Sequence, residues 1–391
     1  MYNEKYSNAA RVISSILKHD QKVNSYKIAL LRAINDVVLD FPDLVDYGQD
    51  IAVPIKVLAE CWISYYWPFM NPERPIYQGP RALRKGVYIN DVSFRPELEM
   101  LYFEWQKMLN TLDVKPSDGF YIRNEMRIAR KLREYSIEFI DYYNKAIKKI
   151  SSAISMPIRY AGDGQWQVFG IPKKPSELEG ITFVPGTNQK DLCVVISKHL
   201  WQGFHQISLY IEALAIHQWS LFLENVKQEN NKKIKRGSVY QLLTARPDNR
   251  RPLTWERNHI DVLIMEGLQF RCPWTKKIIN NPGAYDLDHI IPISLYPINE
   301  LWNLVPCDSI FNSKGKRERL PNNKSLDSAI PVISETYSHY LRDSGLSDAL
   351  REDANSRFVR ISSEGFSIQG LTFAVKNFII SVQKARNIAT F

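Results

Sequence analysis

The chain has 391 residues, 45% of them hydrophobic, and a formal net charge of +9. This length allows two or three domains, and the composition indicates a soluble globular protein with ordinary cores. No window approaches about 18 uncharged apolar residues and the N-terminus lacks the pattern of a signal peptide, so we expect no membrane segment and a cytoplasmic location.

The basic charge is concentrated in one quarter of the chain. Between Lys227 and Lys324 there are 17 Lys and Arg residues against 10 Asp and Glu, which is +7 of the total. Such a concentration favours a polyanionic partner, although many basic proteins bind no nucleic acid. The four cysteines, Cys61, Cys193, Cys272 and Cys307, lie far apart in the sequence. They are typical of reduced thiols and not of a disulfide framework.

The first 150 residues are predicted to be mainly helical. Apolar residues recur at spacings of three and four in 8–20, 26–41 and 51–67. The clearest amphipathic pattern predicts one long helix over 123–150, and its many charges favour a solvated face over a phosphate contact. Residues 156–193 change to Gly, Pro and Trp punctuation and are predicted to be irregular or short strands.

Residues 192–226 are again predicted to be helical and contain three histidines. His199, His205 and His217 are six and twelve residues apart, which does not align them on one helix face, so we interpret them as ordinary core or boundary residues. The predicted organisation is a helical recognition or regulatory region at 1–226, a basic linker or arm at 227–257, a motif-bearing module at 258–325 and helices at 326–391.

The motif begins with Asp288 and His289, which precede an apolar Ile-Ile-Pro run, and continues with Asn303 and Asn312. Cleaving a phosphodiester requires a base for water and a counter-charge for the phosphorane and the leaving oxygen. A neutral imidazole suits the first task near pH 7. A hard cation held by carboxylate and carboxamide oxygens suits the second.

This ordered set resembles the His-Asn-Asn version of the HNH, or ββα-metal, endonuclease motif. The spacing from His289 to Asn303 and Asn312 is similar to that in the HNH nuclease domain of RNA-guided CRISPR effectors. The resemblance covers about 265–325 and implies a β-hairpin followed by a helix with a metal between them. The expected fold class is therefore mainly α with an embedded small ββα-metal module, or α+β overall.

The resemblance also implies roles for individual residues. His289 would be the general base, with Asn303 and Asn312 as the other members of the catalytic motif. Asp288 and Asn312 would hold one Mg²⁺ or Mn²⁺, and Asn303 would fix the loop through backbone contacts. Lys314, Lys316 and Arg317 would contact nucleic acid. The expected product carries a 5′-phosphate.

Many members of this family carry two Cys-x-x-Cys pairs that bind structural zinc. Here Cys272 and Cys307 each stand without the second cysteine, so we expect no structural zinc and a module held by packing. Trp274 and Trp302 would then be structural residues.

We expect a metal-dependent endonuclease acting on DNA, of a restriction or phage-defence type, with RNA open as a substrate. The N-terminal helical region is a candidate surface for a protein partner or trigger. Two alternatives stay open: a non-catalytic nucleic-acid-binding protein that retains the scaffold, and a helical interaction protein with an accidental motif. The role of 156–193 is also open between a ligand pocket, a partner surface and packing.

Overall fold

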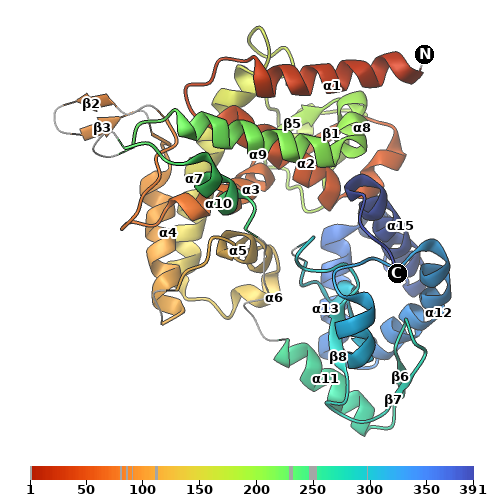
Figure 1. Ribbon diagram of the computed structural model, residues 1–391. Coiled ribbons are helices and arrows are strands. Elements are labelled where there is room, and N and C mark those ends of the chain that lie inside the picture. Colours follow the sequence, from red (N-terminus) through yellow and green to blue (C-terminus); the bar gives the residue numbers. More distant parts are fainter. Residues whose placement is uncertain are drawn as a thin grey trace. The chain divides into compact units, whose positions relative to one another are not determined.

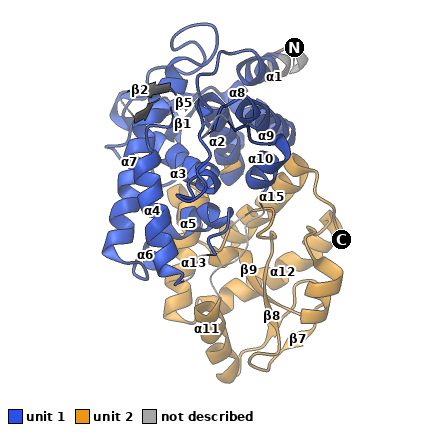
Figure 2. Cartoon of the chain, turned by 60° about the vertical axis from the view of Figure 1, so that its left-hand side comes forward, with its two compact units in different colours: residues 1–40, 44–246 blue, residues 41–43, 247–391 orange. Residues whose placement is uncertain are grey.

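The computed structural model describes residues 2–79, 82–84, 87–89, 91–110, 113–228, 232–245, 253–296 and 298–391, without the side chains of 2–7, 82–84 and 87–89. The chain forms two compact units, residues 1–40 with 44–246 and residues 41–43 with 247–391 (Figure 2). The structure is mainly helical, which confirms the predicted class at that level (Figure 1). Within the described residues, no helix combines the length and the apolar character needed to cross a membrane.

The first unit is built from helices around a small sheet. Its helices are α1 (Tyr2–Lys18), α2 (Tyr26–Asp40), α3 (Ile55–Tyr66), α4 (Arg95–Met108), α5 (Asp118–Met126), α6 (Ala129–Leu132), α7 (Ile137–Arg159), α8 (Lys198–Gln206), α9 (Ser208–Glu224) and α10 (Arg236–Leu243). Its strands are β1 (Ile51–Pro54), β2 (Ala82–Arg84), β3 (Val87–Ile89), β4 (Thr182–Phe183) and β5 (Cys193–Ile196).

Helix α2 lies at the centre of this unit and is buried almost all round. It packs against α3, α7, α8 and α9. A helix with apolar residues on every face can avoid water only in such a position. Its buried Arg32 donates to the carbonyl of Leu243 (3.2 Å) and stacks on the Tyr65 ring (4.4 Å), so the charge is partnered.

The helix predicted over 51–67 begins instead as strand β1. This strand pairs antiparallel with β5, Ile51 opposite Ile196 and Pro54 opposite Cys193, and parallel with β4. The β-branched residues before Pro54 favour a strand, and a proline disfavours helical backbone in the residue before it. Helix α3 starts directly after Pro54.

The single helix predicted over 123–150 is wrong, because the segment forms three helices, α5, α6 and the start of α7. Ser136 begins α7 by accepting a hydrogen bond from the Phe139 amide (3.1 Å), a capping role that ends the preceding turn. The predicted solvated face is present on α7, where Glu138, Asp141 and Lys145 are exposed. It does not extend to α5 and α6, where Lys131 and Glu125 are both buried and form an ion pair at 2.8 Å.

The second unit carries the motif region between one helix and four C-terminal helices. Its helices are α11 (Thr254–Met265), α12 (Asn323–Tyr340), α13 (Ser344–Arg357), α14 (Val359–Glu364) and α15 (Ile368–Arg386). Its strands are β6 (Phe270–Arg271), β7 (Ile278–Ile279), β8 (Asp286–His289) and β9 (Leu304–Cys307). Of the predicted linker 227–257, residues 229–231 and 246–252 lie outside the described residues, and helix α10 occupies part of the remainder.

Candidate active site

The motif lies on a two-stranded antiparallel hairpin. Strand β8 pairs with β9, with Asp286 opposite Cys307 and His289 opposite Leu304. Side chains alternate between the faces of a strand, so Asp286 and Asp288 point to one face and His289 to the other. A short helical turn, Phe311–Lys316, follows β9 and brings Asn312 and Lys316 back to the hairpin.

Asp288 is buried and ion-paired. Its Oδ1 lies 3.0 Å from Nζ of Lys316, and the same ammonium donates to the carbonyl of His289 at 2.6 Å. Burial raises the pKa of Asp288, and the charge and hydrogen bond of Lys316 oppose that rise. Lys316, expected at the phosphate surface, is only 1% exposed, because it is needed to partner the buried carboxylate.

Asp286 is a polar member of the hairpin to which the sequence argument gave no role. Its Oδ2 accepts from Asn312 Nδ2 at 3.1 Å, and its Oδ1 accepts from the Ser309 hydroxyl at 2.9 Å. The motif's last asparagine is therefore oriented by a carboxylate from β8. The period-two spacing of Asp286 and Asp288 was the available signal that both face the same way.

His289 stands at the end of β8, half-buried, with its ring held by Asn299. The Nε2 atom lies 2.8 Å from Asn299 Oδ1. A carboxamide oxygen can only accept a hydrogen bond, so this contact assigns the ring proton to Nε2 and the lone pair to Nδ1. Asn299 was missed in the sequence because an asparagine in the loop 293–300 carries no periodic or spacing signal.

Asn303 joins the two ends of the loop that follows β8. Its Oδ1 accepts from the Ile291 amide (2.8 Å), and its Nδ2 donates to the carbonyls of Ile291 (3.1 Å) and Ile298 (3.2 Å). These are the backbone contacts expected of this residue. The side chain is fully buried, so it does not reach solvent or a substrate.

Helices α12 and α13 support the hairpin from behind. The hydroxyls of Tyr337 and Tyr340 donate to the carbonyls of Trp302 (2.5 Å) and Leu304 (2.9 Å). Asp353 on α13 accepts from the Leu301 amide at 2.6 Å. Backbone groups that hairpin pairing leaves unused are thus satisfied by side chains, which fixes the position of β9.

The two tryptophans expected to be structural lie in packed positions. Trp302 is fully buried, with its ring against Phe358 (5.2 Å) and Phe378 (5.4 Å). The Trp274 ring meets Phe391 edge to face at 5.3 Å. Both rings therefore contribute apolar area to the module.

Cys272 and Cys307 meet beneath the hairpin, with their sulfur atoms 3.5 Å apart and both residues buried. The hydrogen bond from the Cys307 thiol lowers the pKa of Cys272 to about 5, and the same contact raises the pKa of Cys307. Among the described residues, no group of three or more His, Cys, Asp or Glu side chains is arranged to hold a metal ion.

The chemistry of the hairpin donors nevertheless suits a divalent cation. Asp288 Oδ2 is a buried carboxylate oxygen, and the polar neighbours of this carboxylate are Lys316, against Oδ1, and the Trp274 side chain. Asn312 adds a carboxamide beside the Asp286 carboxylate. Hard cations prefer such oxygen donors, so the residues present fit Mg²⁺ or Mn²⁺ by type.

Lys314 and Arg317 are exposed on either side of the buried Lys316. Arg317 adopts a positive φ of 52°, where the short helical turn ends. These two cations are therefore available to a polyanion on the turn that carries Asn312, whereas Lys316 is engaged internally.

Comparison with known families assigns most of the chain. Residues 6–243, more than half of it, match the family described as "Domain of unknown function (DUF8808)". The chain belongs to this family. In this DUF8808 protein, residues 272–322 match the family described as "HNH endonuclease", which supports an HNH-family domain and nucleic-acid binding. The search of curated proteins and the search of solved structures each found no match.

Proposed function

We propose that this DUF8808 protein is a metal-dependent endonuclease that hydrolyses phosphodiester bonds in DNA, with His289 as the general base. The observation that carries the proposal is the held imidazole of His289 on the hairpin of a domain that matches the HNH endonucleases. A binding scaffold has no need of an oriented imidazole beside a buried Asp288–Lys316 pair.

In the proposed reaction, Nδ1 of His289 takes a proton from the attacking water. Asn299 supports this step because it keeps the ring proton on Nε2 and fixes the plane of the imidazole. General-base catalysis by a positioned side chain contributes about 10²–10⁴-fold in rate. Asn303 acts only on geometry, by holding the loop between β8 and β9.

Asp288 and Asn312 are the residues proposed to hold one Mg²⁺ or Mn²⁺, and Asp286 keeps Asn312 oriented. HNH nucleases generally use a divalent metal, which supplies charge to offset the phosphorane and the leaving oxygen. When the ion is absent, the charge of Lys316 opposes the effect of burial on the Asp288 carboxylate.

Lys314 and Arg317 are proposed phosphate contacts. The likeness to the nuclease domain of CRISPR effectors extends through the Asp288-His289, Asn303 and Asn312 spacing. A restriction or phage-defence role, with a large N-terminal region for recognition or regulation, suits a nuclease module inside a longer chain. RNA is the alternative substrate and a non-catalytic nucleic-acid-binding protein is the alternative function.

The test is cleavage of supercoiled and linear DNA by the full chain with Mg²⁺, with Mn²⁺ and with EDTA. We expect metal-dependent nicking or linearisation that falls by about 10²–10⁴-fold in His289→Ala, with unchanged DNA affinity. His217→Ala, an exposed histidine of the first unit, is the matched control and should cleave as the natural chain does.

Near-normal cleavage by His289→Ala would remove the general-base assignment. Cleavage of RNA but not DNA would correct the substrate. If neither is cleaved while DNA is bound in a salt-dependent manner, the binding-protein alternative is favoured.

A further inference from the structure

The first unit contains a cavity of about 1000 Å³ that the proposed nuclease function does not use. It is open on one side and is lined by the segment between α1 and α2, the start of α2, the second half of α7, the loop that follows α7, and Asp91 and Ser93 before α4. Its volume is at the upper end of the range of small-molecule sites. Every lining residue belongs to the first unit, so the cavity is complete within it.

The rim of the cavity carries exposed apolar side chains. Val23, Met156 and Tyr160 are 63%, 53% and 37% exposed, and all three line the opening. The guanidinium of Arg159 lies 5.1 Å from the Tyr160 ring and also binds Gln165 (2.7 Å), which fixes this wall. An exposed aromatic and a thioether at one opening favour a ligand with a planar apolar part.

Three lysines line the same cavity: Lys22, Lys27 and Lys149. Lys22 is partly buried and donates to the backbone carbonyl of Asp20 at 2.9 Å, which uses one of its three N–H groups. Burial lowers the pKa of Lys22, with the Asp20 charge opposing, so an added anion would stabilise its charged form. Lys149 is half-exposed and lies 3.9 Å from Glu97, a distant pairing.

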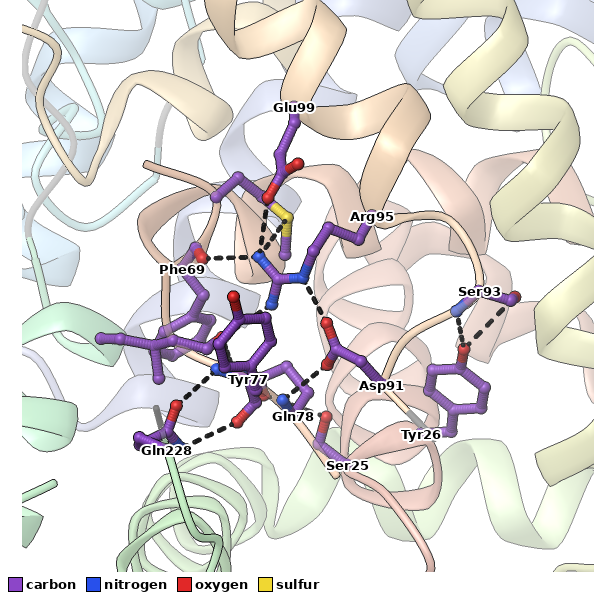
Figure 3. Close-up of polar contacts among 12 residues, drawn as sticks. Ser25, Tyr26, Phe69, Tyr77, Gln78, Asp91, Ser93, Arg95, Glu99 and Gln228 are labelled. Atoms are coloured by element: carbon purple, nitrogen blue, oxygen red, sulfur yellow. Dashed lines mark hydrogen bonds and ion pairs between the residues drawn. The ribbon is translucent and has the colours of Figure 1, made fainter. Parts of the chain in front are cut away.

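Two of the carboxylates in the cavity wall are neutralised from within the protein. Asp20 accepts from Lys27 Nζ (2.8 Å) and from the Gly162 amide (2.9 Å). Asp91 accepts from the guanidinium of Arg95 and from the Gln78 amide (2.8 Å), as Figure 3 shows. Their charges are therefore partnered, which leaves Lys22 and Lys149 against one exposed carboxylate of the lining, Asp163.

The Asp91 side of the wall is also rigid. The Tyr26 hydroxyl accepts from the Ser93 amide at 2.9 Å (Figure 3). Arg95 further donates to the Ile76 carbonyl at 2.8 Å. Because the protein already holds the polar groups of this wall in place, ligand binding does not incur the entropic cost of ordering them.

We propose that this cavity binds a mononucleotide. Lys22 and Lys149 match the charge of a phosphate, and the Tyr160 and Met156 rim matches the face of a base. Asp163, exposed on the glycine-containing loop that follows α7, offers an acceptor for ribose hydroxyls.

A second cavity on the neighbouring face of α7, which shares Ser152 with the first, provides an internal comparison. It measures about 800 Å³ and is lined by Lys56, Lys148 and Lys190 with several serines. Among its described lining residues there is no aromatic side chain. Lys148 and Lys149 are neighbours on one helix but line different cavities. Substituting each in turn therefore distinguishes binding at the proposed site from a general effect of losing one positive charge.

The experiment is calorimetric titration of the full chain with AMP, GMP, CMP and UMP, each compared with its nucleoside and with inorganic phosphate. We expect at least one nucleotide to bind, with its nucleoside and phosphate each at least about tenfold weaker. Lys149→Ala and Tyr160→Ala should each weaken binding by about tenfold, since one charged hydrogen bond or one stacking contact is of that size. Lys148→Ala should change the affinity by less than about twofold.

The proposal is overturned if none of the four nucleotides binds below about 1 mM, or if Lys148→Ala and Lys149→Ala weaken binding equally. Tighter binding of a short single-stranded oligonucleotide that competes with the nucleotide would make the site a nucleic-acid contact. Because the measurement is binding and not cleavage, its result is independent of the nuclease proposal.

Discussion

Two four-residue strands, β1 and β8, differ in the kind of side chain that they place in the interior. Strand β1 reads Ile-Ala-Val-Pro, and its residues are all buried at the centre of a three-stranded sheet. Strand β8 reads Asp-Leu-Asp-His and is also largely buried, yet three of its four side chains are ionisable. Packing alone accounts for β1, whereas β8 requires a partner for every polar group.

The difference indicates that β8 contributes less to the stability of the fold than an apolar strand would. Burying a carboxylate costs several kcal/mol unless it is paired, and a well-packed apolar residue would avoid that cost. In β8 each polar side chain has a partner from later in the sequence: Lys316 for Asp288, Asn312 for Asp286 and Asn299 for His289. Such an arrangement is typical of a functional site.

The largest change in stability should come from removing the partner of Asp288. Lys316→Ala leaves a buried carboxylate without its cation and should destabilise the second unit by about 3–5 kcal/mol. Hydrogen exchange of the β8 and β9 amides in the full chain would measure this locally. Lys314→Ala, two residues away and exposed, should change stability by less than about 0.5 kcal/mol. Equal effects of the two variants would contradict the assigned ion pair.

A somewhat smaller loss of stability is expected from removing the Asn303 side chain, which joins the two ends of the loop after β8. Asn303→Ala removes partners from two carbonyls and one amide and should cost about 2–3 kcal/mol, because buried backbone groups lose their hydrogen bonds. Asn303→Asp keeps the acceptor for Ile291 but places an unpaired carboxylate oxygen against the carbonyls of Ile291 and Ile298, so it should lose more than the alanine variant. Urea denaturation of both variants tests the order, and an alanine variant as stable as the natural chain would refute the bracing role.

The thiol pair predicts a pH effect. The lowered pKa of Cys272 means that its thiolate contributes stability above the unfolded thiol pKa of about 8.5, and that this contribution is lost as the pH falls through about 5. In Cys307→Ala the S–H donor is gone, so the Cys272 pKa should rise. Thiolate absorbance at 240 nm against pH measures it, with Cys272→Ala to assign the signal; an unchanged midpoint would reject the contact.

The smallest effect belongs to the apolar strand. Ile51→Val removes one methylene from a fully buried position and should cost about 1 kcal/mol. DNA cleavage should be unaffected, because β1 carries no polar partner network. Thermal unfolding and the cleavage assay together check this, and a large loss of cleavage would show that the two strands are not independent.

Periodicity predicted helices well where apolar residues recur without interruption. The segment 26–41 contains the whole of α2, and the region 326–391, predicted to be helical, holds most of α12 and all of α13, α14 and α15. The pattern failed where a local signal competes with it. Pro54 separates a strand from a helix, and the Ser136 hydroxyl caps a new helix inside a continuous amphipathic pattern.

For the candidate site, the spacing of Asp288, His289, Asn303 and Asn312 was sufficient to place them on one module. Spacing does not say which way a long side chain turns, so Lys316 was expected at the surface and lies inside. Asn299 and Asp286 were missed because their roles come from folding of the loop and hairpin, which brings them against His289 and Asn312.

The tyrosine hydroxyls of α12 have a consequence for solubility. A two-stranded hairpin exposes unpaired carbonyls along its outer edges, and such edges can recruit strands from other molecules and seed aggregates. Tyr337 and Tyr340 occupy the carbonyls of Trp302 and Leu304 with hydroxyls that are themselves buried. A strand from another molecule would have to displace both hydroxyls before it could pair with these carbonyls. Helix α12 therefore also protects the hairpin against intermolecular β-pairing.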